Sequence, residues 1–354
     1  MEVEVKFDLY FTFRMHDLVH ELALDVSQKE CKTVNSETET ADENVRHLLL
    51  CDEKLVGVPR VLEEMKNVRT YLRALELRDS PLTALPNSIG TLKHLRELDL
   101  ARSEDICKLP RSFYKLYRLQ SLNLGDTGLK QLPDSLQRLI ELRHLVITIK
   151  ATHLKEIRAG CWTSLQYLEL RSCMELECLP EGMQYLKSLR TLVVRRCVKL
   201  VSLPRSLKFL SKLENLVIVC CFRINLKMEL EEEEDKDLQL SLKTLSLFAL
   251  NALTDLPRLP LQGSSSTLQQ LRIIGCRNLS VLPAWLLNLT SLQKLEIVNC
   301  RKLSALPEGI GRLPNLRVLA SRRCPQLSKR YRENGGEDWH KIAHIQKVVI
   351  TDED

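Results

Sequence analysis

A single motif recurs along most of the chain, and its spacing constrains the fold more than any other feature. Segments of the form Leu-x-x-Leu-x-Leu/Ile/Val begin at Leu72, Leu95, Leu119, Leu142, Leu165, Leu189, Leu213, Leu242, Leu268 and Leu292, and an imperfect one, in which Ser321 replaces the last apolar residue, begins at Leu316. The spacing is 23 or 24 residues at eight of the ten steps, and 29 and 26 residues at the steps that start at Leu213 and Leu242. A period of this length is typical of solenoids, in which every unit packs against its two neighbours. A looser unit begins at Val45, so about twelve units are expected.

Each unit has two halves with different patterns. When the first leucine is counted as position 1, apolar residues at positions 4 and 6 alternate with polar ones, which predicts a short strand with one buried face. In seven units a Leu-Pro pair follows, with apolar residues three and six places after the proline, as in Pro86, Ile89 and Leu92. Proline fixes φ where a helical turn begins and lacks a donor that would be unpaired there.

This pattern resembles the leucine-rich-repeat family over residues 45–327. The resemblance implies an α/β solenoid, a horseshoe with a parallel sheet on its concave side and short helical turns on its convex side. Each leucine layer would then be buried only by its neighbours.

Six of the twelve cysteines share position 9 of the repeat. They are Cys173, Cys197, Cys221, Cys276, Cys300 and Cys324. One cysteine per layer supplies one ligand per layer and not a tetrahedral set, so no metal is expected. The resemblance implies instead that these side chains donate to loop carbonyls where the chain turns inward. We expect the thiols to be reduced because the chain shows no export signal.

The first thirty residues follow other patterns. Residues 2–14 alternate between polar and apolar, which predicts a strand or a hairpin. After Arg14 the apolar spacing becomes helical, and this stretch contains His16-Asp17-Leu18-Val19-His20. A helical His-Glu-x-x-His is a zinc-hydrolase motif, and here Asp replaces the Glu. No downstream His or Glu stands at a recognisable spacing for a third ligand, so a zinc hydrolase is only an alternative, which metal analysis would test.

Two segments resemble plant nucleotide-binding, leucine-rich-repeat disease-resistance receptors of the coiled-coil type. RMHDLVHELALDVS, from Arg14, resembles the Met-His-Asp motif that ends their nucleotide-binding module, and CPQLSKRYRENGGEDWHKIAHIQKVVI, from Cys324, is similar to their closing segment. The resemblance implies that His16 lies against the phosphates of bound ADP and that Asp17 holds the resting loop.

The same resemblance divides the chain into four parts. Residues 1–30 would be a remnant of the nucleotide-binding (NB-ARC, winged-helix) module, 31–44 a linker, 45–327 the repeats and 328–354 a cap, with Trp339, Ile342 and Ile345 covering the last layer. The chain contains no Gly-x-x-x-x-Gly-Lys-Ser/Thr loop to hold phosphates. No cofactor is therefore expected in this chain. ADP or ATP would be bound by intact members of the family. A nucleotide-binding domain, in the same chain or in another, would be a partner of this chain.

Strand residues at positions 3, 5 and 7 point away from the core and form the concave surface. In the N-terminal units they include Glu76, Arg78 and Asp99, which is ordinary charged surface. Between Leu189 and Leu292 they become apolar with a basic rim, which predicts a protein-binding surface. Its expected residues are Arg171, Val193, Arg195, Val217, Val219, Phe248, Arg272, Ile274, Lys294 and Val298. Two alternatives stay open: strand propensity alone placed these residues there, or another domain of the same protein covers them.

The composition narrows the class of function. The net charge of +6, from 52 basic and 46 acidic residues, is too balanced to indicate a nucleic-acid partner. No apolar run approaches the roughly 20 residues of a membrane span, and no secretory signal is evident, so a cytoplasmic protein is expected.

We interpret the sequence as the recognition and autoinhibition region of a plant innate immune receptor. It would be no enzyme; it would bind pathogen effector or host guard proteins and trigger the defence response. The alternative is an intracellular leucine-rich-repeat scaffold or adaptor without an immune role.

Overall fold

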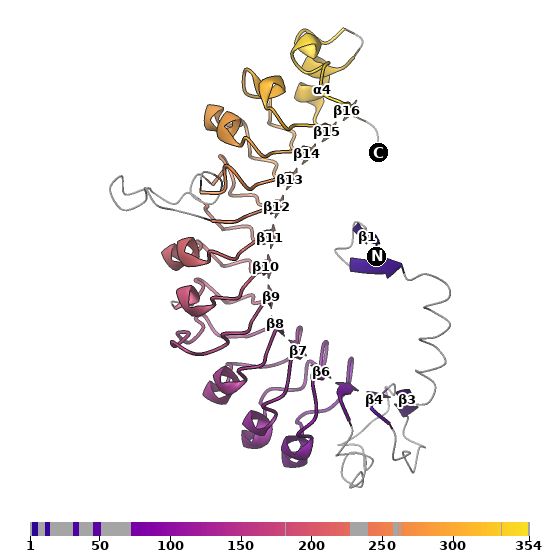
Figure 1. Ribbon diagram of the computed structural model, residues 1–354, viewed down its shortest axis with the longest axis vertical. Coiled ribbons are helices and arrows are strands. Elements are labelled where there is room, and N and C mark those ends of the chain that lie inside the picture. Colours follow the sequence, from indigo (N-terminus) through magenta and orange to yellow (C-terminus); the bar gives the residue numbers. More distant parts are fainter. Residues whose placement is uncertain are drawn as a thin grey trace.

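One curved parallel sheet dominates the molecule (Figure 1). The computed structural model describes residues 2–5, 11–14, 31–34, 45–50, 72–180, 182–226, 240–257, 261, 263–333 and 335–352. Within these residues fourteen strands pair in sequence order, and every neighbouring pair is parallel. They are β3 (Cys31–Val34), β4 (His47–Leu50), β5 (Ala74–Glu76), β6 (Glu97–Asp99), β7 (Ser121–Leu124), β8 (His144–Ile147), β9 (Tyr167–Arg171), β10 (Thr191–Arg195), β11 (Asn215–Val219), β12 (Thr244–Phe248), β13 (Gln270–Ile274), β14 (Lys294–Val298), β15 (Val318–Arg322) and β16 (Lys347–Thr351). The expected leucine-rich-repeat solenoid is confirmed.

The segment before the sheet forms an antiparallel hairpin. Strands β1 (Glu2–Val5) and β2 (Phe11–Arg14) pair with Glu2 opposite Arg14 and Val5 opposite Phe11. Alternation allowed a strand or a hairpin for residues 2–14, and the described residues 2–5 and 11–14 pair antiparallel, as the strands of a hairpin do.

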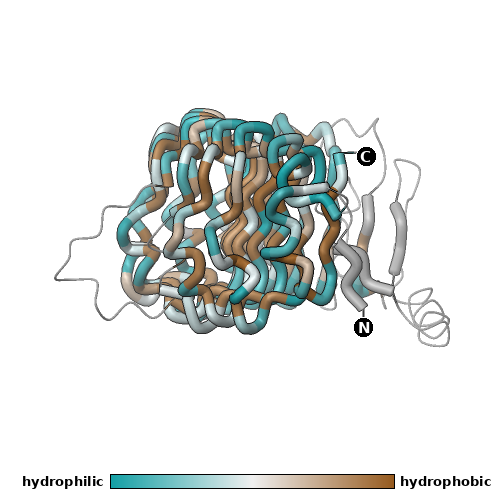
Figure 2. The backbone as a smooth tube through the Cα atoms, turned by 90° about the horizontal axis from the view of Figure 1, so that it is seen from above, coloured by the Kyte–Doolittle hydropathy of each residue, from teal (hydrophilic) through white to brown (hydrophobic). Residues whose placement is uncertain are grey.

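The core is a stack of leucine layers, as the repeat predicts. In the unit of β10, Leu189, Leu192 and Val194 are each 0% exposed. Parallel pairing in register places Leu192 between Leu168 of β9 and Leu216 of β11. Figure 2 shows apolar residues recurring at the same places in successive coils. Each buried leucine stabilises the fold by about 2 kcal/mol, and neighbouring layers supply the cover.

The convex side consists of short 3₁₀ turns (Figure 1). Five of them directly follow a proline: η2 (Asn87–Thr91), η3 (Arg111–Lys115), η4 (Asp134–Arg138), η6 (Arg205–Phe209) and η7 (Ala284–Asn288). Two follow a glycine: η5 (Met183–Tyr185) and η8 (Ile310–Arg312). The proline is the residue before the turn and not its first residue, with φ −70° at Pro86. Gly182 has φ +87°, and a Cβ there would collide with the carbonyl of Ile157, so the position requires glycine.

After β5 to β15, except β8, the chain turns through one residue with a left-handed backbone, such as Arg196 with φ 54°. The next residue, at position 9, points inward. The Sγ of Cys197 lies 3.8 Å from the carbonyl oxygen of Leu170 and 3.6 Å from that of Arg195. The other five cysteines at this position are buried and make the same kind of contact. Burial raises the pKa of Cys276 to about 11, so this thiol stays protonated as a donor at neutral pH.

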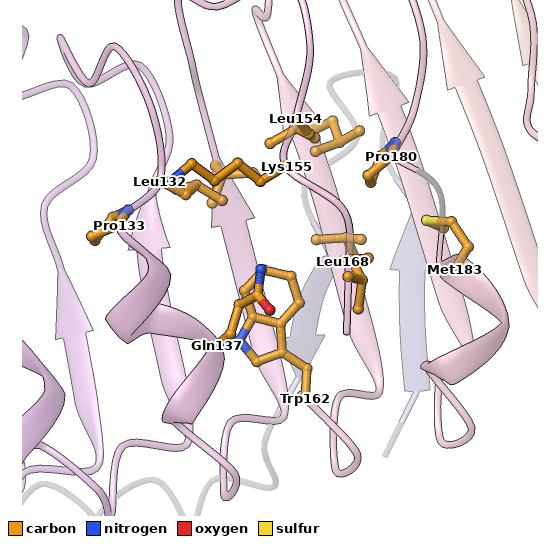
Figure 3. Close-up of a pocket in the computed structure, with 12 residues that line it drawn as sticks. Leu132, Pro133, Gln137, Leu154, Lys155, Trp162, Leu168, Pro180 and Met183 are labelled. Atoms are coloured by element: carbon orange, nitrogen blue, oxygen red, sulfur yellow. The ribbon is translucent and has the colours of Figure 1, made fainter. Parts of the chain in front are cut away.

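The unit that begins at Leu142 lacks Leu-Pro, and the described residues between η4 and β9 contain no helix. Trp162, 4% exposed, takes the place of the missing turn, and its indole N–H donates to the carbonyl of Leu136 at 3.0 Å. A cavity of about 20 Å³ remains beside it, with Gln137 and Met183 on its wall (Figure 3). This volume holds about one water, so it is a packing defect and not a ligand site.

Both ends of the sheet extend further than the sequence indicated. The expected cap contains the end of helix α4 (Pro325–Tyr331), the turn η9 (Trp339–Lys341) and strand β16, which pairs with β15 and so forms one more layer. Ile342 and Ile345 are buried, and Trp339 packs against the core.

At the other end, β3 lies within the expected linker 31–44 and pairs with β4, because the backbone of β4 leaves an edge on which another strand can pair. None of the described helices is long and apolar enough to cross a membrane.

Candidate protein-binding surface

Residues at one repeat position form a row across the concave side, because the strands are parallel and in register. Four apolar residues follow one another in the row at position 7. They are Val219 (β11), Phe248 (β12), Ile274 (β13) and Val298 (β14), each the Cα partner of the next. We call these four residues the apolar ladder. Arg195 precedes the ladder on β10, and Arg322 follows it on β15.

The apolar ladder is more enclosed than the alternation alone indicated. Its end residues Val219 and Val298 are each 8% exposed, and Val193 in the adjacent row is 5% exposed. Phe248, Ile274 and Val217 are half-buried. Strands only about 4.8 Å apart let large side chains in one row cover one another. None of these residues belongs to the leucine core, so the apolar surface that is open on the concave side lies mainly at the three half-buried residues.

The predicted basic rim is an ion network along one flank of the ladder. Glu296, with a side chain 12% exposed, lies 3.0 Å from Arg272 Nε and 3.2 Å from Lys294 Nζ. Burial acts to raise the pKa of Glu296, but the charges of Lys294 and Arg272 outweigh it, so this pKa is lowered and the carboxylate stays ionised. The Arg272 guanidinium also stands 5.4 Å from the centre of the Phe248 ring, in cation–π range. Arg272 and Lys294 thus share one carboxylate, which balances one of their two positive charges.

A second charged cluster surrounds Glu169 at the other end of the ladder, and the sequence did not reveal it. The Glu169 side chain is only 2% exposed. Its carboxylate accepts hydrogen bonds from Tyr167 Oη at 2.7 Å and Arg171 Nε at 2.8 Å. Arg195 Nε lies 3.6 Å away, and Arg171 also approaches Asp126 at 4.0 Å. The signal in the sequence was Glu169 at position 5 of its unit, with Arg171 at position 7 of the same unit and Arg195 at position 7 of the next unit.

Charge pairing continues into the N-terminal half of the concave side. Arg78 Nε donates to Asp99 at 2.8 Å and lies 3.8 Å from Glu76. Asn123 donates to the same Asp99 carboxylate at 3.1 Å. This half is polar and internally paired, so it differs in chemistry from the half that carries the apolar ladder.

Two predicted residues cannot be placed in this way. His16 and Asp17, the predicted nucleotide-sensing pair, lie outside the described residues, as does the acidic insertion at 231–237. Across the part of the chain that the structure describes, no group of three or more His, Cys, Asp and Glu side chains could hold a metal ion.

Two family models match separate parts of the chain. A model described as "Leucine-rich repeat region" matches residues 59–159, and one described as "R13L1/DRL21 LRRs" matches residues 261–324. The chain is 26% identical over 204 residues to the Arabidopsis thaliana disease resistance RPP13-like protein 4, a match that covers 50% of this chain and 21% of that protein. It is 34% identical over 102 residues to a Solanum bulbocastanum sequence named as disease resistance protein RGA1, which covers 28% and 10% of the two. The chain therefore spans only a small part of the length of these relatives.

Among solved structures, the chain is similar to the Toll–Spatzle complex of Drosophila. The TM-score is 0.58 at 18% sequence identity, and the match covers 78% of this chain and 40% of that chain. At this identity the likeness concerns the fold alone.

Proposed function

We propose that this chain, a leucine-rich-repeat protein of the plant disease-resistance type, is the recognition and autoinhibition region of an innate immune receptor. It would bind a pathogen effector or a host guard protein through its concave side, and so trigger the defence response.

The observation that carries this proposal is the apolar ladder. Four consecutive layers present apolar side chains on the side opposite the leucine core, and cationic side chains stand beside and beyond them. Protein interfaces combine an apolar centre with a polar rim, and aromatic residues and arginine supply much of the binding energy. Phe248, with Arg272 over its ring, is the strongest candidate for such an anchor.

In this proposal the chain acts by binding and not by catalysis, and it does so in the cytoplasm. The solenoid supplies a stiff support, because every strand from β4 to β15 is paired on both sides and packs between two neighbouring layers. His16 and Asp17 would contact ADP only when a nucleotide-binding domain is present, in cis or in trans. Ligand capture on the concave side would then compete with contacts that hold this domain at rest.

A substitution pair tests the concave side directly. We expect the Val217→Asp/Phe248→Asp variant to lose the partners that wild type recovers from infected plant tissue, as measured by quantitative co-purification. Two half-buried carboxylates would face the apolar surface of the partner. The matched control is Phe209→Asp/Val281→Asp, in which both residues are exposed and lie outside the concave rows.

The outcomes separate the proposal from its competitors. Loss of partners in the concave variant but not in the control supports it, provided that both variants unfold at the same urea concentration as wild type. Equal recovery by all three proteins would refute a concave binding surface. Recovery of the same partners from healthy and infected tissue, with no effector or guard protein among them, would favour the scaffold without an immune role.

A further inference from the structure

We propose that the apolar ladder and the arginines at its two ends receive an amphipathic helix of the partner, with one acidic residue beyond each end of its apolar face. This proposal rests on the proposed function, because it names the partner chemistry of the same surface. The contacts of Arg195 and Arg322, the row spacing and the charge of the flank each bear on it.

Arg195 marks the first end. Among the described residues its one nearby carboxylate is Glu169, at 3.6 Å, which already accepts hydrogen bonds from Arg171 and Tyr167. The Nε of Arg195 is buried and makes no hydrogen bond within the described part of the chain. Arg171 and Arg195 are direct partners on adjacent strands, an arrangement of like charges that is unfavourable when nothing balances it. Arg171 has Asp126 at 4.0 Å in addition to Glu169, whereas Arg195 shares Glu169 alone, so Arg195 is the guanidinium of this pair that a partner carboxylate would serve.

Arg322 marks the second end. It follows Val298 in the same row and is exposed. Within the described residues, no carboxylate lies within ion-pair distance of it. A carboxylate from a partner would therefore gain a charge-assisted hydrogen bond with Arg322 without displacing an existing one.

The spacing of the row favours a helix over an extended segment. Neighbouring strands place ladder residues about 4.8 Å apart. Successive turns of a helix present side chains every 5.4 Å or so, whereas one face of an extended chain repeats only about every 6.6 Å. From Arg195 to Arg322 the row crosses five strand steps, about 24 Å, which corresponds to roughly 16 helical residues or about four turns.

The flank of the ladder adds a second constraint on the partner. Arg272 and Lys294 share the single carboxylate of Glu296 there, while the four residues of the apolar ladder carry no charge, so the middle of the row itself offers apolar contact. A helix that suits this surface is apolar in its middle and acidic at both ends. A helix with carboxylates in its middle would bury them against the apolar ladder, which is unfavourable.

A pair of synthetic peptides tests the proposal on the full chain. The first is a stapled helix with two glutamates roughly 16 residues apart and leucines along the same face over the two to three turns between them; the second has lysines in place of the two glutamates. We expect wild type to bind the glutamate peptide about tenfold more tightly, as measured by fluorescence anisotropy. Arg322→Glu should abolish this preference, and should restore binding to a peptide in which only the facing glutamate is changed to lysine.

Two control variants distinguish recognition of the peptide from a folding defect and from non-specific charge attraction. Arg301→Glu changes the net charge equally at an exposed residue outside the row, and it should leave the preference intact. Arg195→Gln tests the arginine at the other end of the ladder without placing a new carboxylate beside Glu169. This variant should reduce the preference for the glutamate peptide several-fold.

The proposal would be overturned by equal affinity for both peptides, by the same loss in Arg301→Glu as in Arg322→Glu, or by equal binding of a proline-containing peptide that cannot form a helix. Tighter binding of inorganic phosphate than of the glutamate peptide, by competition, would show an anion site and no helix site. If the Val217→Asp/Phe248→Asp variant loses its natural partners while the peptides fail, the proposed function stands and the helix proposal falls. If the peptides succeed and the natural partners survive that variant, the proposed function falls alone.

Discussion

Replacement of Glu169 by glutamine tests whether burial determines how much an ion pair on the concave side contributes to the free energy of unfolding. The substitution keeps the shape of the side chain and removes its charge. In the folded protein the carboxylate is 2% exposed and receives Arg171 Nε at 2.8 Å and Tyr167 Oη at 2.7 Å. A glutamine has one acceptor oxygen, so one of these two donors would meet an amide N–H instead. Both Arg171 and Arg195 would then lose the anion that lies closest to them.

The expected loss of stability follows from these contacts. Removal of one partner from a buried ion pair costs about 3 to 5 kcal/mol. The side chains of Arg171 and Arg195 are 27% and 21% exposed, so water compensates part of the charge. We therefore expect the free energy of unfolding to fall by about 2 to 4 kcal/mol.

Urea unfolding followed by circular dichroism measures this change, and hydrogen exchange at β9 and β10 shows whether it is local, as a solenoid predicts. The matched control is Glu175→Gln. Glu175 pairs with Lys199 at 2.6 Å, but the two side chains are 47% and 42% exposed, so its loss should cost less than about 1 kcal/mol. Equal effects of the two substitutions would refute the reasoning from burial.

A second readout comes from Tyr167. Burial, and then the adjacent charge of Glu169, raise the pKa of Tyr167 far above its usual value near 10. The glutamine variant should release a tyrosine that ionises at lower pH, visible as tyrosinate absorbance. An unchanged titration would show that the carboxylate does not act on this hydroxyl.

Three further predictions concern the core, the rim and the turns. Leu295→Ala should destabilise the chain by about 2 to 5 kcal/mol, because Leu295 is 0% exposed, and hydrogen exchange should become faster in β13 to β15. An equal change in exchange along the whole sheet would contradict this prediction. The lowered pKa of Glu296 gives stability that is fully present above its unfolded value near 4.3 and is lost as pH falls through the folded value, so wild type and Glu296→Gln should converge in urea midpoint at acidic pH. Cys197→Ser should unfold at a higher urea concentration than Cys197→Val, because Ser103 at the equivalent position donates to Leu77 at 2.9 Å while valine has no donor.

The sequence was sufficient for the repeating part of the fold. Leucine at positions 1, 4 and 6 determines which face of each strand is buried, so the row that contains Val219 and Phe248 follows from strand alternation. The degree of enclosure does not follow from it. Val219 is 8% exposed because it lies between Arg195 and Phe248, whose size and rotamers alternation does not specify.

Departures from the template were less predictable. The unit at Leu142 lacks Leu-Pro, and nothing in the repeat pattern indicated that Trp162 would fill the gap and bond to Leu136. The strand β16 lies beyond a helix that breaks the period, so no first leucine announces it. Glu169 was readable in principle, because its pairing with Arg195 depends only on the register of two adjacent units.

Strand propensity alone could have produced the apolar ladder, and the two halves of the sheet allow this alternative to be judged. Position 7 is occupied in the first four full units by Arg78, Ala101, Gly125 and Thr148, and in β11 to β14 by the apolar ladder. The same backbone turn follows Arg78 and Ala101 as follows the ladder residues, with a left-handed residue at position 8. In those four units the strand ends before position 7, but β9, β10 and β15 include an arginine there. A β-branched or aromatic residue is therefore not required for the strand to reach this position. Four apolar residues in a row, ended by Arg195 and Arg322, are better explained by contact with another molecule or domain than by the needs of the solenoid.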